Sequence, residues 1–277
     1  MSKFEILCVT MKQTDFSKIQ SMNIHSDVVF ANQTDKTSFD QILFDGIHSA
    51  KMISTQTRGV GKNRNLSLIY ASADICLLAD DDIVYRDDVE QVVLNEFEKH
   101  PDADIFLFNY NAVDAEKRKI KFFKKTQKSS KIFRKMGGGI RIAFRLASVK
   151  KANLWFTTLF GGGCIFPCGE DSKWLVDAYS KNLNVYVSKE SIGTVYFGDS
   201  SWFSGVNEHY FYGFGAYYRD AHPLVYPLWT LYFALRTKKM TKMSFFEKIR
   251  WMRNGINGYE DLLSYENFLK SKSFSHK

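Results

Sequence analysis

Three consecutive carboxylates, Asp80, Asp81 and Asp82, are the residues of this sequence best suited to chemistry. They directly follow Ile75–Ala79, a short apolar run typical of a strand that is buried on both faces. Open α/β sheets bind their ligands at the carboxyl ends of such strands. Asp80 and Asp82 can project to one side and share a hard divalent cation, which prefers oxygen ligands. The alternative is a solvated acidic turn before a helix that begins near Asp87.

A second candidate segment, rich in glycine and cations, precedes this strand. Residues 57–65 read TRGVGKNRN and open a helical pattern, so that backbone amides lie beside Lys62 and Arg64 in a way that suits a phosphate. The spacing matches neither a P-loop nor a complete dinucleotide fingerprint, in which a third glycine would replace Arg64. The glycines could serve only to form a turn. Three cations in seven residues, Arg58 included, favour an anionic ligand because the surrounding half of the chain is acidic.

A third candidate segment is Gly161–Gly169, which reads GGGCIFPCG and is followed by Glu170 and Asp171. Glycines of this kind permit a close approach to the backbone. The acidic pair opens a predicted helix that runs to about Lys181. Two acids in a first turn are favourable against the helix dipole, and by itself this structural role is the simpler interpretation.

The elements that position these residues alternate between strand and helix, which predicts an α/β fold with a mostly parallel sheet covered on both faces. The predicted strands are Phe4–Thr10, Val28–Ala31, Met52–Thr55, Ile75–Ala79, Asp104–Phe108, Ile140–Leu146, Val185–Val187 and Thr194–Phe197. The predicted helices include Asp15–Met22, Val89–Lys99 and a C-terminal helix that begins with a capping box at Ser244 and Glu247.

Charge is distributed unevenly along the 277 residues. The net charge is +8, yet residues 1–116 carry 10 basic and 19 acidic groups, whereas residues 117–135 carry ten basic groups and no acidic one. This basic tract is interpreted as a solvated loop, with a polyanion-binding loop as the alternative. The basic amphipathic helix after Ser244 is expected to pack on the domain or to lie on an anionic bilayer.

Four cysteines without a second metal-ligand pair argue against a zinc site. Because the first strand begins at Phe4 and no apolar run approaches the roughly 20 residues that span a bilayer, we expect a cytoplasmic protein, peripheral at most on the inner face of the membrane.

Taken in order, the G-x-G-K-N-R-N segment, the apolar strand, the three aspartates, the glycine-rich turn and the Gly-Glu-Asp helix start resemble family 2 glycosyltransferases. The resemblance covers about residues 4–196. It implies the GT-A fold, a Rossmann-type sheet that binds a nucleotide sugar, here with a helical C-terminal extension. The expected regions are 1–115 for the nucleotide sugar, 116–215 for the acceptor and 216–277 for the basic helices.

The resemblance also implies residue roles. Asp82 and Asp80 match the D-x-D ligands of Mn²⁺ or Mg²⁺, and His209 matches the place of a further ligand in some GT-A enzymes. Asp171 matches the catalytic base of inverting members, with Glu170 in support. The expected contacts to the nucleotide sugar are Thr10, Asn32, Asp35, Arg58, Gly59, Lys62, Arg64, Asp80, Asp81, Gly162 and Gly163.

The expected function is therefore a metal-dependent, inverting transfer of a sugar from a nucleoside-diphosphate sugar to a hydroxyl of a saccharide or lipid-linked acceptor. The other expected partner is an anionic membrane. No nucleic-acid partner is expected. A nucleotidyltransferase is one alternative, although the loop after the first strand lacks its glycines. The other is a non-enzymatic nucleic-acid-binding module that uses the basic tract.

Overall fold

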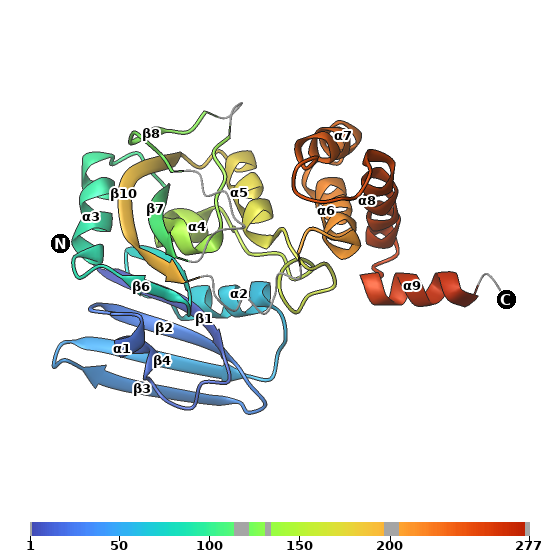
Figure 1. Ribbon diagram of the computed structural model, residues 1–277. Helices are drawn as coiled ribbons and strands as arrows, with labels where there is room; N and C mark the ends of the chain where they lie inside the picture. The colour runs from blue at the N-terminus through green and yellow to red at the C-terminus, as the bar shows by residue number, and fades with distance from the viewer. Residues whose placement is uncertain (1, 114–121, 131–133, 197–204, 275–277) are drawn as a thin grey trace. The chain divides into compact units, whose positions relative to one another are not determined.

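The structure is a computed structural model that describes residues 2–113, 122–130, 134–196 and 205–274 (Figure 1). The chain divides into two compact units. Unit 1 comprises Met1–Arg58, Lys62–Phe156 and Trp174–Asp199, and unit 2 comprises Gly59–Gly61, Thr157–Lys173 and Ser200–Lys277. The functional boundaries expected at residues 115 and 215 stay a prediction.

Unit 1 is built on one sheet with the strand order β3-β4-β2-β1-β5-β9-β7-β10-β6, and β8 pairs with β10. The strands β4, β2, β1 and β5 pair in parallel, as do β7 and β10, whereas β3, β9, β6 and β8 run antiparallel to their neighbours. The bounds are Phe4–Met11 (β1), Asp27–Gln33 (β2), Ser38–Phe44 (β3), His48–Thr55 (β4), Ile75–Asp80 (β5), Ile83–Tyr85 (β6), Ile105–Val113 (β7), Gln127–Lys128 (β8), Ile142–Arg145 (β9) and Val185–Tyr196 (β10).

Helices cover both faces of this sheet, as the alternating pattern predicts. Along β1, Ile6 and Cys8 belong to one core cluster and Leu7 to the other, because successive side chains of a strand point to opposite faces. The first cluster includes side chains of α3 (Val89–Lys99) and contacts α1 (Lys18–Ser21). The second includes side chains of α2 (Val60–Tyr70), α4 (Leu146–Lys151) and α5 (Glu170–Ser180). The mixed α/β fold with a mostly parallel sheet is therefore confirmed.

Unit 2 contains α6 (Glu208–Ala221), α7 (Tyr226–Arg236), α8 (Phe245–Glu260) and α9 (Tyr265–Phe274). Glycines let α6 and α8 approach closely: a Cβ on Gly215 would lie 2.0 Å from the Met252 carbonyl oxygen, and one on Gly255 would lie 1.9 Å from that of Tyr212. The capping box is present, because the side chain of Ser244 accepts from the Glu247 N–H and the Glu247 carboxylate accepts from the Ser244 N–H. The helix after Ser244 thus packs on α6 through its small and apolar side.

Four local predictions differ from the structure. The helix expected at Asp15–Met22 shrinks to α1, because the Asp15 carboxylate accepts the Ser17 N–H in a turn and Asn23 has a positive φ. The strand expected at Ile140–Leu146 starts later, after a 3₁₀ turn at Gly139–Arg141. The strands expected at Val185–Val187 and Thr194–Phe197 are parts of one strand, β10. Its pairing with β7 is irregular around Ser191, so the sequence pattern did not predict a continuous strand. Strands β3 and β6 were not predicted, β3 because almost all of its residues are exposed and show no alternation.

Two further expectations concern the basic and apolar segments. The basic tract 117–135 lies partly outside the described residues, as does Phe197, and its polyanion-binding role stays a prediction. In the part of the chain that the structure describes, no helix has the length and hydropathy needed to cross a membrane.

Candidate active site

The carboxyl ends of the parallel strands bring three of the predicted donor-site residues to one edge of the sheet. In the strand register, Thr10 of β1 lies beside Asn32 of β2, which lies beside Ser54 of β4. On the other side of β1, Val9 lies beside Asp80 of β5. Thr10, Asn32 and Asp80 therefore share the edge at which open α/β sheets bind ligands.

Arg64 holds one side of Asp80. Its side chain is almost fully buried, and Nη2 donates to Asp80 Oδ1 at 3.0 Å, while the Asp80 side chain stays 42% exposed. The guanidinium carbon lies 5.5 Å from the ring centroid of Phe156. A Cβ on Gly139 would lie only 2.3 Å from Nη2, so glycine is needed beside this side chain. The confined guanidinium orients the first carboxylate of the run.

Asp81 has a different environment from its neighbours. The Thr10 hydroxyl donates to Asp81 Oδ2 at 2.5 Å, and Lys18 Nζ lies 3.5 Å from the same oxygen. Lys18 also donates to the Asp81 carbonyl oxygen at 3.0 Å. Asp82 follows in the turn before β6 and is exposed. Asp81 therefore secures the turn, and the role of Asp80 and Asp82 as cation ligands stays a prediction.

Two buried titratable groups, Cys8 and Tyr85, lie near the carboxylates. Burial raises the pKa of the Cys8 thiol, and the negative charges of Asp81 and Asp80 raise it further. Burial also raises the pKa of the Tyr85 hydroxyl. Both groups are therefore uncharged at neutral pH.

Asn32 fastens the loop after β1 to the sheet. The side chain is fully buried, and its amide donates to the Gln13 carbonyl oxygen at 2.9 Å and to Ser54 Oγ at 3.0 Å. Its own carbonyl oxygen accepts the Gln13 N–H at 3.0 Å. These bonds give Asn32 a positioning role, and a direct contact with the nucleotide base stays a prediction.

Asp35 and Arg58 form an exposed ion pair, with Arg58 Nη2 at 2.5 Å from Asp35 Oδ1. Arg58 Nη1 also donates to the Thr34 carbonyl oxygen at 3.0 Å. The structure thus joins these two predicted residues to each other, beyond the end of β2. Their contact with a nucleotide is untested.

Helix α2 separates the two cations expected to bind phosphate. Residues two apart on a helix point about 200° apart around its axis. Lys62 is accordingly exposed, whereas Arg64 is buried against Asp80. Of this pair, Arg64 is the one that the structure places at the aspartates, and a role for Lys62 stays a prediction.

In unit 2, the glycines of the two predicted loops lie side by side. The Val60 N–H donates to the Gly162 carbonyl oxygen at 2.9 Å. Gly59 has a φ of +115°, and a Cβ there would lie 2.8 Å from Cys164 Sγ and 3.6 Å from the Gly163 carbonyl oxygen. A Cβ on Gly161 would lie 2.9 Å from Glu170 Oε2. The structure therefore brings Gly59, Gly162 and Gly163 together beside the start of α5.

Asp171 lies, partly buried, in the first turn of α5. Gly169, which precedes this turn, has a φ of +113°, and a Cβ there would lie 2.8 Å from Tyr217 Cδ2. Lys173 Nζ lies 3.4 Å from Asp220 Oδ2. Glycine and this ion pair thus fix the start of the helix that carries both acids, and the catalytic roles of Glu170 and Asp171 are untested.

His209 on α6 contacts α9. Its ring centroid lies 4.8 Å from that of Tyr265, and Nε2 lies 4.0 Å from Glu266 Oε1. These contacts describe a surface histidine in an aromatic setting. Its role as a metal ligand stays a prediction.

Sequence reasoning missed three contributors to the donor side. Lys18 gives no local signal, because only the fold brings α1 to Asp81. Asn63 stands between Lys62 and Arg64, and its buried amide donates to the carbonyl oxygens of Thr10 and Ala31 at 3.4 and 3.3 Å. Gly137–Gly139 is a triple glycine in the sequence, a signal that another group approaches the backbone closely. In the structure that group is Arg64, which lies beside Gly139.

The donor set at the β5 turn fits a divalent cation whose coordination is completed by a substrate. Among the described residues, no group of three or more His, Cys, Asp or Glu side chains is arranged as a metal site. Mg²⁺ is usually bound by one or two carboxylates together with substrate phosphates, not by a full cage of protein ligands. Asp80 and Asp82 are the pair that the sequence predicts for this role, and the role stays a prediction.

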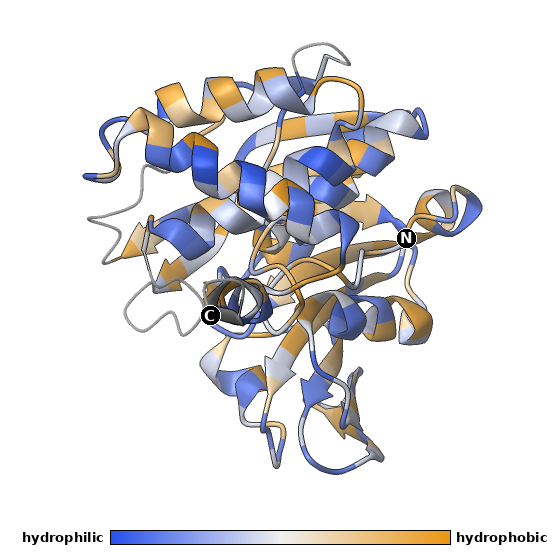
Figure 2. Ribbon diagram, turned by 90° about the vertical axis from the view of Figure 1, so that its right-hand side faces the viewer, coloured by the Kyte–Doolittle hydropathy of each residue, from blue (hydrophilic) through white to orange (hydrophobic). Residues whose placement is uncertain are grey.

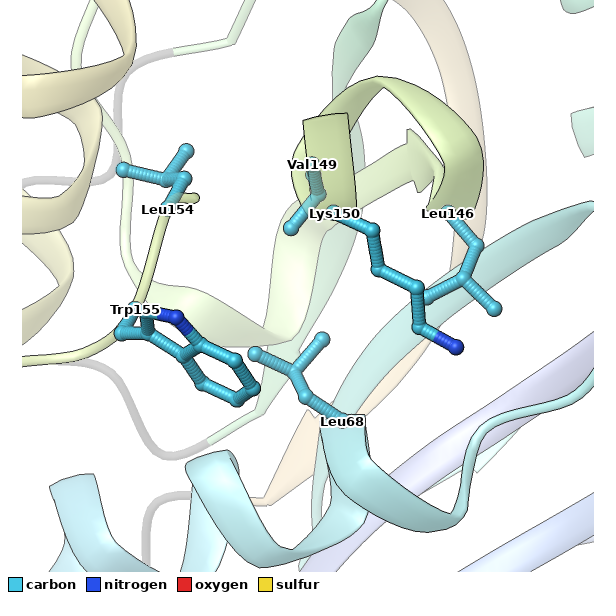
Figure 3. A pocket seen from close by; sticks show the side chains of 6 residues that line it. All are labelled: Leu68, Leu146, Val149, Lys150, Leu154 and Trp155. Carbon is cyan, nitrogen blue, oxygen red and sulfur yellow. The ribbon is translucent and has the colours of Figure 1, made fainter. Parts of the chain in front are cut away.

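A small apolar hollow in unit 1 lies away from these residues. Figure 3 shows the six side chains that line it: Leu68, Leu146, Val149, Lys150, Leu154 and Trp155. It contains none of the predicted site residues and offers one amine, Lys150 Nζ, which lies 3.4 Å from the Ala71 carbonyl oxygen.

Comparisons with known proteins concern the family and the fold. Residues 26–152 match the sequence model of glycosyl transferase family 2. A crystal structure of S. aureus TarS 1–349 in complex with UDP-GlcNAc matches with a TM-score of 0.59 at 12% identity, over 95% of this chain and 93% of that one. TarS 1–349 in complex with UDP gives 0.58 at 14% identity, over the same shares. A longer TarS chain gives 0.56 at 15% identity, over 96% of this chain and 44% of that one. No curated protein matches this chain.

The likeness to TarS establishes the GT-A fold, since identities this low speak for the fold alone. The segment matched by the family model contains Arg64, Asp80, Asp82 and Gly139. Residues 26–152 are thus similar to glycosyl transferase family 2, and the fold is that of a GT-A glycosyltransferase. The predicted resemblance is thereby confirmed.

Proposed function

We propose that this glycosyltransferase uses a nucleoside-diphosphate sugar and a divalent cation, Mn²⁺ or Mg²⁺, and inverts the anomeric carbon. The acceptor is a hydroxyl of a saccharide or of a lipid-linked saccharide. The observation that carries the proposal is the arrangement at the end of β5, where Arg64 orients Asp80 and Asp82 stays exposed.

A uridine diphosphate sugar is the first donor to consider, because the TarS structures of the same fold contain UDP-GlcNAc and UDP. Thr10 and Asn32 stand at the strand ends where the base and ribose of such a donor would lie. The Asn32 side chain acts here by holding Gln13.

At the diphosphate, Asp80 and Asp82 would hold the cation, which as a Lewis acid offsets the negative charge that develops on the leaving phosphate. Arg64 keeps Asp80 in a fixed orientation. A preorganised charge of this kind stabilises the transition state because it needs no rearrangement during the reaction.

Asp171 is the proposed general base. An acceptor hydroxyl is too weak an acid to ionise at neutral pH, so a carboxylate must take its proton as the new bond forms. The acceptor oxygen bonds to the anomeric carbon, the bond from that carbon to the phosphate oxygen breaks, and the proton passes to Asp171. A single displacement of this kind inverts the configuration.

The test is a panel of nucleotide sugars incubated with Mn²⁺, with hydrolysis or transfer followed by NMR of the anomeric proton. Wild type should release or transfer sugar with inverted configuration. Asp171→Asn should lose at least a hundredfold in rate, as expected for a missing general base, while its UDP affinity stays unchanged. Glu98→Gln, which neutralises an exposed acid on α3, is the matched control. Retained configuration, or wild-type turnover in Asp171→Asn, would refute the assignment.

A further inference from the structure

Helix α7 of unit 2 has two apolar sides, and only one of them is covered. Thr230, Ala234 and Thr237 are buried on the side that contacts α6 and α8. Phe233 belongs to the same side, with its ring centroid 4.4 Å from that of Phe214 on α6. These contacts fix the rotation of the helix about its axis.

The opposite side of α7 presents an exposed leucine stripe, defined as Leu224, Leu228, Leu231 and Leu235. Leu224, in the turn before the helix, is 93% exposed, and the other three are 67%, 45% and 60% exposed. Leu228, Leu231 and Leu235 are spaced three and four residues apart, which places them on one helical face, and Leu224 precedes them in the turn. Trp229 and Tyr232, both partly exposed, flank the stripe. Figure 2 shows the ribbon coloured by hydropathy, with hydrophobic residues in orange.

The charge around the stripe has one sign. Residues 221–243 contain four basic residues and no acidic one. The four, all exposed and all at the C-terminal end of the stripe, are Arg236, Lys238, Lys239 and Lys242. Exposed Met240 stands among them. Leucines beside Trp, Tyr and several cations are the composition of a helix that lies in the interface of an anionic bilayer.

We propose that α7 is a membrane-docking helix whose leucine stripe enters the headgroup region of an anionic lipid bilayer, with the four cations on the lipid phosphates. The sequence pattern offers this possibility for two segments, the apolar run Leu224–Leu235 and the amphipathic helix after Ser244. The structure favours the first of them, α7, because α8 buries Met252, Gly255 and Gly258 on its small and apolar side.

A second copy of the chain is the less suitable occupant. Leucine pairs between helices need a repeat sustained over about three to four heptads, and this stripe spans less than two. Parallel pairing of two stripes would also bring like charges together at Arg236 and Lys239. The charge complementarity with anionic lipid has no such cost. The proposal is independent of the sugar or acceptor used.

The test measures co-flotation of the full chain with phosphatidylglycerol-containing vesicles and with pure phosphatidylcholine vesicles, without donor or acceptor. Wild type should bind the anionic vesicles, and salt should weaken the binding. Leu228→Gln with Leu231→Gln should lower the affinity roughly tenfold or more, since apolar burial drives insertion. The exposed pair Leu43→Gln with Ile47→Gln on the β3–β4 hairpin is the matched control and should bind as wild type.

The electrostatic part is tested by Lys238→Gln, Lys239→Gln and Lys242→Gln combined. Each of these three cations contributes a favourable free energy of similar size to binding an anionic membrane surface. The triple variant should therefore lose on the order of a hundredfold in affinity for the anionic vesicles. The matched triple variant changes exposed lysines elsewhere to Gln: Lys36, Lys151 and Lys181.

Three results would overturn the proposal. Wild type could fail to float with anionic vesicles, or the α7 variants could bind as tightly as their controls. The leucine variant could also convert a dimer into a monomer in sedimentation without changing vesicle binding, which would assign the stripe to a second copy. UDP binding should be equal in all variants. A failure of the membrane-docking proposal can therefore be distinguished from a failure of the proposed sugar transfer.

Discussion

A single methyl group added at Gly139 should disable the donor site through Arg64. The backbone of Gly139 has no positive φ, so alanine can adopt its conformation. The added carbon would lie 2.3, 2.6 and 2.8 Å from Arg64 Nη2, Cζ and Nη1. To regain van der Waals distance the guanidinium must retreat by about 1 Å. The 3.0 Å hydrogen bond to Asp80 then exceeds the normal limit for such a bond.

The size of the effect follows from the bond that is lost. A hydrogen bond to a charged group contributes about 1.5–3 kcal/mol, which corresponds to roughly a 10- to 150-fold loss in affinity. The guanidinium is the end of a flexible side chain, so the change should affect UDP affinity in the presence of Mn²⁺ more than the melting temperature. Calorimetric titration of UDP and a thermal melt of the same sample measure both.

Gly137→Ala is the matched control in the same loop. Its Cβ would lie 2.4 Å from Arg141 Cδ, so it crowds an arginine to the same degree. The Arg141 guanidinium lies between the rings of Tyr110 and Phe123, 4.9 Å from each centroid, and burial lowers its pKa. Because Arg141 is not the partner of Asp80, this variant should bind UDP nearly as wild type.

A double-mutant cycle then decides whether Gly139 acts through Arg64. In an Arg64→Met background, Gly139→Ala should cost almost nothing further, because the group it displaces is already gone. Wild-type UDP affinity in Gly139→Ala, or full additivity of the two changes, would refute the reasoning.

Two predictions concern stability. Burial raises the pKa of Glu5, although its carboxylate accepts the Ser72 N–H at 2.9 Å. A carboxylate whose pKa is raised in the folded state destabilises the fold as pH rises through that pKa. Glu5→Gln should therefore melt at a higher temperature than wild type at pH 7. The difference should vanish at pH 4, where the wild-type carboxyl group is protonated. A higher wild-type melting temperature at pH 7 would contradict this. Gly215→Ala should lower the free energy of unfolding by at least about 1 kcal/mol, because its Cβ would clash with the Met252 backbone. This loss is expected although alanine has the better helix propensity. Both this variant and the control, exposed Asn257→Ala on α8, are unfolded in a urea titration, in which the control should be neutral or stabilising. Equal effects of the two changes would exclude the clash.

Much of the fold could be predicted because its signals are local. The apolar runs of β1, β2 and β5 and the periodicity of α3 and α5 appear within single windows of sequence. Strand β3 could not be predicted, because its residues face solvent and it is held by pairing with β4. Strand β9 was expected, but its position between β5 and β7 depends on long-range pairing, which no local stretch of sequence predicts.

The candidate site divides in the same way. The aspartate run and the helix that carries Arg64 could be found from residue type and spacing. Their partners could not: Lys18 reaches Asp81 across 63 residues of chain, and Thr10 reaches it across 71. The opposite exposures of Lys62 and Arg64 also required knowing where α2 begins.

The most direct test of the central claim is calorimetric titration of UDP into wild type and Asp82→Asn, each with Mn²⁺ and with EDTA. Asp40→Asn, which changes an exposed aspartate of β3, is the control. We predict that wild type and the control bind UDP at least tenfold more tightly with Mn²⁺ than with EDTA, and that Asp82→Asn binds equally weakly in both. Equal Mn²⁺ enhancement in Asp82→Asn would show that the carboxylates at the end of β5 do not hold the cation that binds the diphosphate.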